Sequence, residues 1–183
     1  MHGDIVQTFE RLKLPTQAQL DGLRRHGVPT RAMIYDWCDS PVELRRGFVE
    51  FLPGNRFVFE DESVSGVVVD TLVVIARDET GDPDDLVAFD LSGRFGSWLG
   101  LPVLGLENAL LPRMSDALPV HRTPIDWLSN YRRGVVVIDH KKARHFLENS
   151  GPFAVASTEQ GRHLMAALSF KPQILIQAAR AAA

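Results

Sequence analysis

The spacing of apolar residues changes twice along the chain and predicts three parts of different structure. Within residues 1–45, apolar positions recur every three or four residues, as on the buried face of a helix. Pro15 stops the first helical segment, and Thr16 with Gln19 forms a capping-box sequence that starts the second. A third helix is expected from Thr30. We predict a helical hairpin that packs on a sheet, in preference to a DNA-binding helix-turn-helix unit of the same outline.

From residue 46 to about 110 the period of the pattern becomes two. Apolar runs flank a Pro-Gly-Asn turn at 53–55, which predicts a β-hairpin. The nearly all-apolar stretch from Val64 to Ala76 predicts a long central strand, and Leu86 to Leu91 predicts another. Because the connections are short, these strands should form an antiparallel meander. The glycine-spaced segment from Ser92 to Leu106 matches no phosphate-loop motif and predicts a turn with packed aromatic residues.

Residues 111–172 alternate between helix and strand patterns. Thr123-Pro124 is a helix start with a cap and a proline at the first helical position. The run Val135 to Ile138 lacks the polar alternation of a half-solvated strand, so we expect it to be covered on both faces. A helix from about Lys141 to Asn149 and a strand from Phe153 to Ala156 should follow. This βα unit requires two parallel strands, and Thr158 can cap a further helix.

These patterns predict an α+β fold with a mixed, mainly antiparallel sheet, an N-terminal helical hairpin and a C-terminal βαβα segment. The C-terminal strands are expected to join the sheet formed by residues 46–91. Alanine-rich residues 173–183 predict a helical tail, either exposed or in contact with a second copy in a homo-oligomer. One domain should span residues 1–183, with a helical part at 1–45, a β-rich part at 46–110, a βαβα part at 111–172 and the tail at 173–183.

The composition is that of an ordinary globular protein. Of the 183 residues, 45% are hydrophobic and 23% are charged, and the single cysteine, Cys38, excludes an intramolecular disulfide. The most apolar run, Val67 to Ala76, contains Asp70 and is shorter than the roughly 20 residues that span a bilayer. The N-terminus has no secretory pattern. We expect a cytoplasmic protein with no membrane partner.

Charge is unevenly distributed along the chain. The whole sequence carries a net charge of −3, which does not favour binding to nucleic acid or anionic membranes in bulk. Residues 60–90 hold ten acids and one arginine, a local net charge of −9, whereas residues 113–163 hold eight basic and five acidic residues, a local net charge of +3. Solvated turns explain the acids, but an acidic face that binds a protein partner is an alternative.

The densest cluster of candidate functional residues follows the buried strand that ends at Ile138. A helix start there would present unpaired main-chain N–H groups and a positive dipole, which attract anions. Five polar residues of this strand–helix junction are the predicted ligand-binding site: Asp139, His140, Lys141, Lys142 and Arg144. The expected partner is a phosphate-bearing ligand or nucleic acid. Against this, Asp139 is also a good N-cap that would occupy those N–H groups itself.

Two alternatives to an anion-binding module remain. A non-catalytic interaction protein would use the acidic central loops or the C-terminal tail. A small enzyme would use Asp139 and His140 as an acid–base pair, but the sequence identifies no further catalytic group. No cofactor or metal is predicted, because His140 and His145 diverge around a helix and no CxxC or HExxH motif is present. Asp70 lies within an apolar strand and is either a hydrogen-bond anchor or a functional group.

Overall fold

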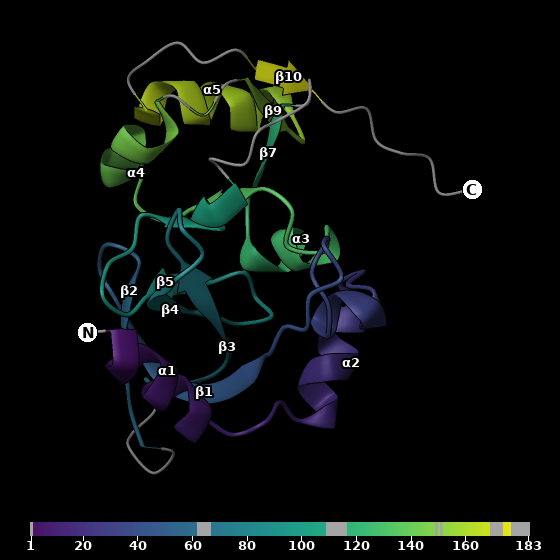
Figure 1. The fold of residues 1–183 in the computed structure, drawn as a ribbon, viewed down its shortest axis with the longest axis vertical. Coiled ribbons are helices and arrows are strands. Elements are labelled where there is room, and N and C mark those ends of the chain that lie inside the picture. Colours follow the sequence, from purple (N-terminus) through teal and green to yellow (C-terminus); the bar gives the residue numbers. More distant parts are fainter. Residues whose placement is uncertain are drawn as a thin grey trace.

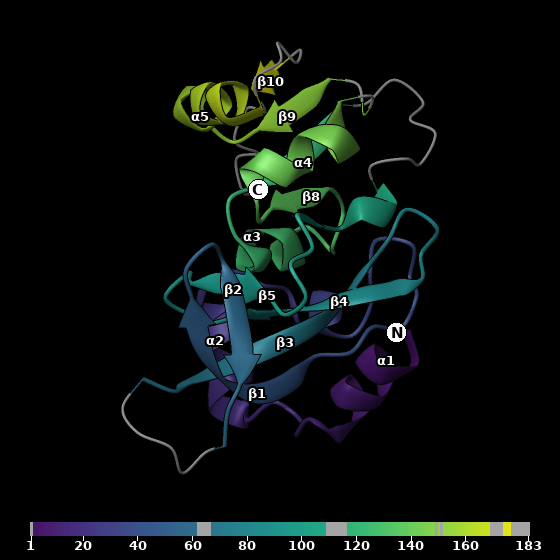
Figure 2. The ribbon, with the colours of Figure 1, turned by 90° about the vertical axis from the view of Figure 1, so that its left-hand side faces the viewer.

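The fold consists of a β-barrel and a second sheet stacked along the long axis of the molecule (Figures 1 and 2). The computed structural model describes residues 2–61, 67–108, 117–148, 150, 152–168 and 174–176. The α+β class, the N-terminal helices and the C-terminal βαβα order are confirmed. The helices are α1 (His2–Arg11), α2 (Gln17–Arg25), η1 (Thr30–Met33), η2 (Leu106–Asn108), α3 (Pro124–Ser129), α4 (His140–Leu147) and α5 (Thr158–Leu168). The strands are β1 (Arg45–Leu52), β2 (Arg56–Phe59), β3 (Val69–Arg77), β4 (Pro83–Phe89), β5 (Phe95–Ser97), β6 (Val103–Leu104), β7 (Leu118–His121), β8 (Val135–Val137), β9 (Phe153–Val155) and β10 (Ile174–Ile176).

The barrel has the strand order β1-β2-β5-β4-β3 and closes on itself. Its pairs are antiparallel, as the meander predicts, except for the parallel pair β2–β5, in which Arg56 lies opposite Ser97. Gly96 permits this closure, because a Cβ there would lie 2.9 Å from the main-chain oxygen of Asn55. The third predicted helix is only the short η1, and the predicted turn at 92–106 contains β5 and β6.

The barrel interior is apolar and is covered at one side by α1. Ile5 and Phe9 of α1 are almost completely buried against Phe57, Val73 and neighbouring barrel residues. The apolar spacing that predicted the first helix therefore marks its contact face. Most of the energy that holds α1 comes from this burial, because a helix of 10 residues is marginal by itself in water.

The second sheet has the order β10-β9-β7-β8-β6 and corrects one prediction. The C-terminal strands do not join the first sheet, because a closed barrel offers no edge strand for them to extend. They form their own sheet around β7, a strand that was not predicted from the sequence. Strands β8 and β9 both run parallel to β7 and flank it, so their parallel direction is confirmed although they are not neighbours.

Strand β8 is buried on both faces, as its continuous apolar sequence predicts. Val136 packs towards the barrel and α3 in the same core as Trp127, whereas Val135 and Val137 pack in a second core with α4 and α5. Thr123 caps α3 in a capping box with Asp126, as the Thr-Pro start predicts. Helix α3 therefore covers one face of the second sheet, and α4 and α5 cover the other.

The predicted helical tail is wrong where the structure describes it. Ile174–Ile176 form β10, which pairs in parallel with β9. Isoleucine favours extended backbone, and β9 presents main-chain groups that a neighbouring strand satisfies. Residues 177–183, and with them most of the predicted oligomer contact, lie outside the described residues. Within the described ranges the longest helix, α5, has 11 residues, and no helix has the length and apolar character to cross a bilayer.

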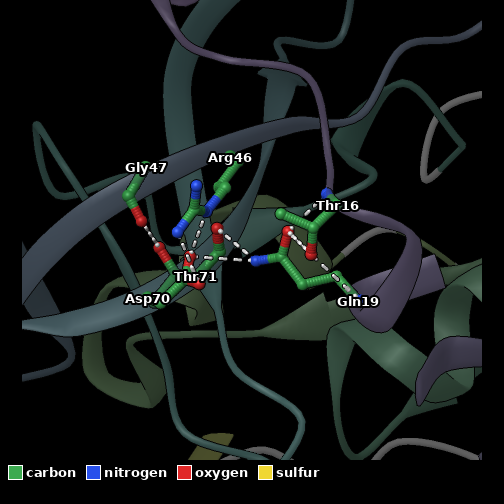
Figure 3. A network of polar contacts seen from close by, with 6 residues as sticks. All are labelled: Thr16, Gln19, Arg46, Gly47, Asp70 and Thr71. Carbon is green, nitrogen blue, oxygen red and sulfur yellow. Dashed lines mark hydrogen bonds and ion pairs between the residues drawn. The ribbon is translucent and has the colours of Figure 1, made fainter. Parts of the chain in front are cut away.

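Asp70 anchors α2 to the barrel (Figure 3). Its carboxylate accepts two hydrogen bonds from Arg46, at 2.8 and 3.0 Å, and one from Gln19 Nε2 at 3.0 Å. Gln19 is also the capping-box partner of Thr16 at the start of α2. The neighbouring Thr71 donates to the carbonyl of Gly47 at 2.9 Å. These contacts make Asp70 a hydrogen-bond anchor between α2, β1 and β3.

Candidate functional site

The parallel strands β7 and β8 end side by side, and the chain leaves them in opposite directions. After β7 it enters α3 on one face of the sheet, and after β8 it enters α4 on the other face. In open α/β sheets, such a reversal opens a crevice at the carboxyl ends of the strands where ligands bind. His121 is the last residue of β7, and Asp139 and His140 follow β8. The fold therefore brings together residues that are far apart in sequence.

A pocket of about 420 Å³ lies at these strand ends, between the second sheet and the barrel. Its volume falls in the range of small-molecule sites, roughly 300–1,000 Å³. We call it the β7–β8 pocket. Its walls come from the barrel, from the ends of β7 and β8 and from the first turns of α5. The lining residues are Asn55, Phe95, Val120, His121, Arg122, Val137, His140, Glu159, Gln160, His163 and Leu164.

His121 is fixed by a main-chain contact. Its Nε2 lies 2.8 Å from the carbonyl oxygen of Arg133. Because a carbonyl only accepts, Nε2 carries a hydrogen, and the neutral ring keeps Nδ1 as an acceptor. Burial lowers the pKa of His121, and the contacts with the Arg133 carbonyl and with Asp126 oppose that shift. At neutral pH the ring is uncharged and gains a donor when it takes up a proton.

His140 and His163 lie close enough to influence each other. The surrounding protein removes part of the water around His140 and so lowers its pKa. Asp139 raises this pKa, and His163 lowers it because two imidazolium ions repel each other. An anion beside His140 would act in the same direction as Asp139 and raise its pKa.

Hydrogen bonds hold α5 and the barrel at the pocket. Gln160 donates from Nε2 to the carbonyl of Val120 at 2.8 Å and accepts the N–H of Ala156 at 3.1 Å. Arg122 donates to Ser157 Oγ at 2.6 Å. From the barrel, Asn55 donates from Nδ2 to the carbonyl of Ile138 at 2.7 Å. The pocket walls are thus tied to one another through side chains of three separate segments.

The predicted junction residues do not all reach this pocket. Asp139 is the N-cap of α4, and its carboxylate accepts the N–H groups of Lys141 at 2.9 Å and Lys142 at 3.3 Å. Those two donors are therefore occupied and do not form an anion site. Lys141, Lys142 and Arg144 are exposed on α4, and of the five predicted residues His140 lines the pocket.

Sequence reasoning missed the residues that β7 and α5 contribute. His121 and His163 are separated by about forty positions, and Arg122 and Glu159 belong to no motif. The signal that could have found them was the short apolar pattern before His121, which is strand β7. Among the residues that the structure describes, no group of three or more His, Cys, Asp or Glu side chains is placed to hold a metal ion.

The acidic central region is largely engaged in local hydrogen bonds. Asp85 is buried and accepts the N–H groups of Leu86, Leu99 and Leu101 at 2.7, 2.8 and 2.9 Å. Asp90 accepts from Ser92 and pairs with Arg94, whose contacts lower the Asp90 pKa against the effect of burial. Asp78 orders the turn between β3 and β4 in the same way. These acids stabilise turns, which reduces the acidic surface left for a partner.

Comparison with known proteins gives no family. No protein-family model and no curated protein matches the chain. Among solved structures, the chain is similar to the primase fragment of the bacteriophage T7 primase-helicase protein, with 12% sequence identity and a TM-score of 0.41. The similarity covers 67% of this chain and 56% of that fragment, so the chain spans little more than half of the fragment's length. Similarity at this level establishes neither a shared family nor a shared activity.

Proposed function

We propose that the β7–β8 pocket binds a phosphate-bearing ligand of nucleotide size. The main supporting observation is that His121, His140, His163 and Arg122 all line this pocket. It lies at the carboxyl ends of the parallel strands β7 and β8, from which the chain leaves towards opposite faces of the sheet. This moves the expected anion site from the start of α4 into the adjacent pocket. His140 is common to both.

The chemistry of recognition would come from Arg122 and from proton uptake by the imidazoles. An arginine provides a permanent positive charge and several donors for phosphate oxygens. A bound phosphate raises the pKa of neighbouring imidazoles, because the opposite charge stabilises the protonated form. Affinity should therefore increase as the pH falls towards about 6.5, the ordinary histidine pKa. Glu159 opposes binding by charge repulsion.

The apolar part of the lining suits the uncharged part of a nucleotide. Phe95 of β5 is half-buried and provides an aromatic ring, and Leu164 of α5 adds an aliphatic surface. Bases stack on aromatic rings with little dependence on their identity. The same pocket could hold the end of a nucleic acid, with Lys141, Lys142 and Arg144 contacting phosphates outside it.

Titration calorimetry with adenosine 5′-monophosphate tests the proposal, with adenosine as the probe that lacks the phosphate. We expect saturable binding of the nucleotide and binding at least tenfold weaker for adenosine, since charge-assisted hydrogen bonds are lost. Arg122→Gln should weaken nucleotide binding about tenfold, whereas the matched variant Glu159→Gln should strengthen it. Equal binding of nucleotide and nucleoside, or an unchanged affinity in Arg122→Gln, would contradict the proposal.

A single-stranded oligonucleotide distinguishes a free nucleotide from nucleic acid. Neutralising Lys141, Lys142 and Arg144 together should weaken the binding of a dT12 strand and reduce its salt dependence. The same change should leave adenosine 5′-monophosphate binding within about twofold, because these side chains lie outside the pocket. Tight binding of the strand alone would assign the site to nucleic acid. The acid–base role of Asp139 and His140 stays a prediction that no described contact favours.

A further inference from the structure

A second pocket lies between α1, the segment before β1 and the end of β3. Its volume is about 250 Å³. Arg45, Arg77 and Arg132 contribute to its lining together with Glu10 and Glu43, and Phe9 is part of its apolar wall. We call it the arginine pocket. Three arginines against two glutamates leave a formal excess of one positive charge.

Arg132 is the unusual residue of this pocket. Only 7% of its surface is exposed, and its Nε has no hydrogen-bond partner. One terminal nitrogen donates to the carbonyl of Glu43 at a long 3.3 Å, and the guanidinium lies 5.5 Å from the centre of the Trp127 ring. A buried guanidinium with unpaired donors is costly, so a missing acceptor is the simplest explanation.

The main chain is strained at the same place. Tyr131 and Arg132 both adopt the left-handed conformation, with φ of 55° and 63°. Such conformations cost energy in residues other than glycine, and they persist where surrounding contacts enforce them, often at binding sites. From this turn the Arg132 side chain extends inwards, away from solvent. Its backbone thus positions the guanidinium for a contact within the protein or with a ligand.

Neighbouring groups supply only part of the missing counter-charge. Arg45 is already paired with Glu43, through contacts of 2.5 and 3.1 Å. Arg77 donates to the carbonyl of Gly81 at 2.8 Å and is otherwise exposed. Asp36 and the half-buried Glu107 both supply negative charge near Arg132, but loss of solvent raises the pKa of Glu107 to about 7, so near neutral pH Glu107 carries only part of a charge. Its own Oε2 also lacks a hydrogen-bond partner.

We propose that the arginine pocket binds a carboxylate attached to a short apolar body, as in an organic acid or the C-terminus of a peptide. A guanidinium fork matches the two oxygens of a carboxylate, and the excess of one positive charge suits a monoanion. Phe9 and Ile75 provide the surface for the apolar body. The small volume excludes an extended ligand from lying wholly inside.

The test uses NMR spectroscopy of the ¹⁵N-labelled full-length protein and follows the Nε–H resonance of Arg132. This resonance is assigned by its absence from the spectrum of the Arg132→Lys variant. N-acetyl-L-leucine should shift this signal in a saturable manner, and its methyl ester, which has no carboxylate, should not. Arg77→Gln should weaken the acid about tenfold, whereas Arg25→Gln, an exposed arginine on α2 outside the pocket, should not. Arg77 is exposed, so its replacement is not expected to affect folding.

The other possible outcomes overturn the proposal or identify the source of the carboxylate. An identical response to acid and ester, no response to the acid, or unchanged affinity in Arg77→Gln would overturn it. Tighter binding of inorganic phosphate than of the acid would overturn the assignment of a carboxylate. The tetrapeptide Ala-Ala-Ala-Leu separates the two sources: affinity equal to or higher than that of N-acetyl-L-leucine assigns a peptide C-terminus, and affinity about tenfold lower assigns a free organic acid.

Discussion

Polar side chains make different contacts in the barrel and at the carboxyl ends of β7 and β8. In the barrel, Asp70, Asp85 and Asp90 accept hydrogen bonds from main-chain groups, from arginines or from Gln19. Asp70 joins α2 to the barrel, and Asp85 and Asp90 stabilise loops. At the ends of β7 and β8, His121, His140 and Arg122 border an open pocket instead. The acids of the first region join elements and order turns, whereas His121 and Arg122 of the second region make protein contacts and also line a pocket.

This contrast follows from topology. In the mainly antiparallel barrel, amino and carboxyl ends of strands alternate at each rim, and side chains such as Asp78 and Asp90 stabilise the connecting turns. A parallel sheet whose chain reverses direction leaves a crevice that no main-chain pairing fills. The acid-rich sequence of the barrel region and the mixed charge of the C-terminal third therefore carry different information. Acidic side chains order turns in one region, and histidines and an arginine line a pocket in the other.

Replacing Asp85 by alanine should give the largest effect and tests whether barrel acids are structural. Three main-chain N–H groups lose their acceptor in a buried site, and we expect a loss of about 3–5 kcal/mol in the free energy of unfolding. Asp85→Asn keeps one acceptor oxygen and should lose about 1–2 kcal/mol. Urea unfolding monitored by circular dichroism measures both. A loss below about 1 kcal/mol in the alanine variant would contradict the structural role of the barrel acids.

Glu107, a half-buried residue of η2, should show the next largest effect. Its folded pKa is raised from 4.5 to about 7, so the folded state holds the proton more tightly than the unfolded chain. The contribution of Glu107 to stability is therefore fully present below about pH 4.5 and is lost as the pH rises through about 7. Glu107→Gln should remove this dependence and stabilise the protein by about 2 kcal/mol at pH 8. Urea unfolding at several pH values provides the measurement, and parallel profiles for the two proteins would refute it.

Asp70→Asn should destabilise the protein by about 1 kcal/mol, because its side chain is 40% exposed and solvent screens the pair with Arg46. Nucleotide binding should not change, since Asp70 anchors α2 far from the β7–β8 pocket. Thermal unfolding and calorimetry on the same sample check both statements. A marked loss of nucleotide binding without a loss of stability would show that Asp70 has a role in binding. The distinction between structural acids in the barrel and pocket residues in the second sheet would then be wrong.

The smallest expected effect is the change of nucleotide affinity with pH. Binding of adenosine 5′-monophosphate should strengthen several-fold between about pH 8 and 6.5, because the imidazoles gain protons when an anion is bound. The phosphate itself keeps most of its second charge in this range, since its second pKa is about 6. His140→Gln should reduce the pH dependence. Calorimetry in buffers of different ionisation enthalpy would also detect the proton uptake directly.

Much of the fold could be predicted from the sequence, because local chemistry determines it. The capping residues Thr16 and Thr123 start helices where expected, and the apolar run from Val135 forms a strand covered on both faces. Closure of the barrel could not be predicted, since it depends on a short parallel pairing of β2 with β5, in which Arg56 lies opposite Ser97 and Ser97 donates to the carbonyl of Asn55. Likewise, β10 has only three residues within an alanine-rich segment that favours helix.

The candidate site was only partly visible in the sequence. The abrupt change from Ile138 to Asp139 and His140 located the end of a buried strand, but it could not show that Asp139 caps its own helix. Whether a carboxylate closes a helix or faces a ligand is decided by side-chain rotation rather than by residue type. The other pocket residues depend on β7 and α5 lying beside that strand, which is a long-range arrangement.

Arg132 and Arg133 are consecutive residues that face different pockets. The side chain of the first lines the arginine pocket, and the carbonyl of the second accepts the hydrogen of His121 in the β7–β8 pocket. A small rotation of the backbone here would alter the guanidinium and the imidazole together. The two binding events would then be thermodynamically linked, with each ligand changing the affinity of the other by the same factor.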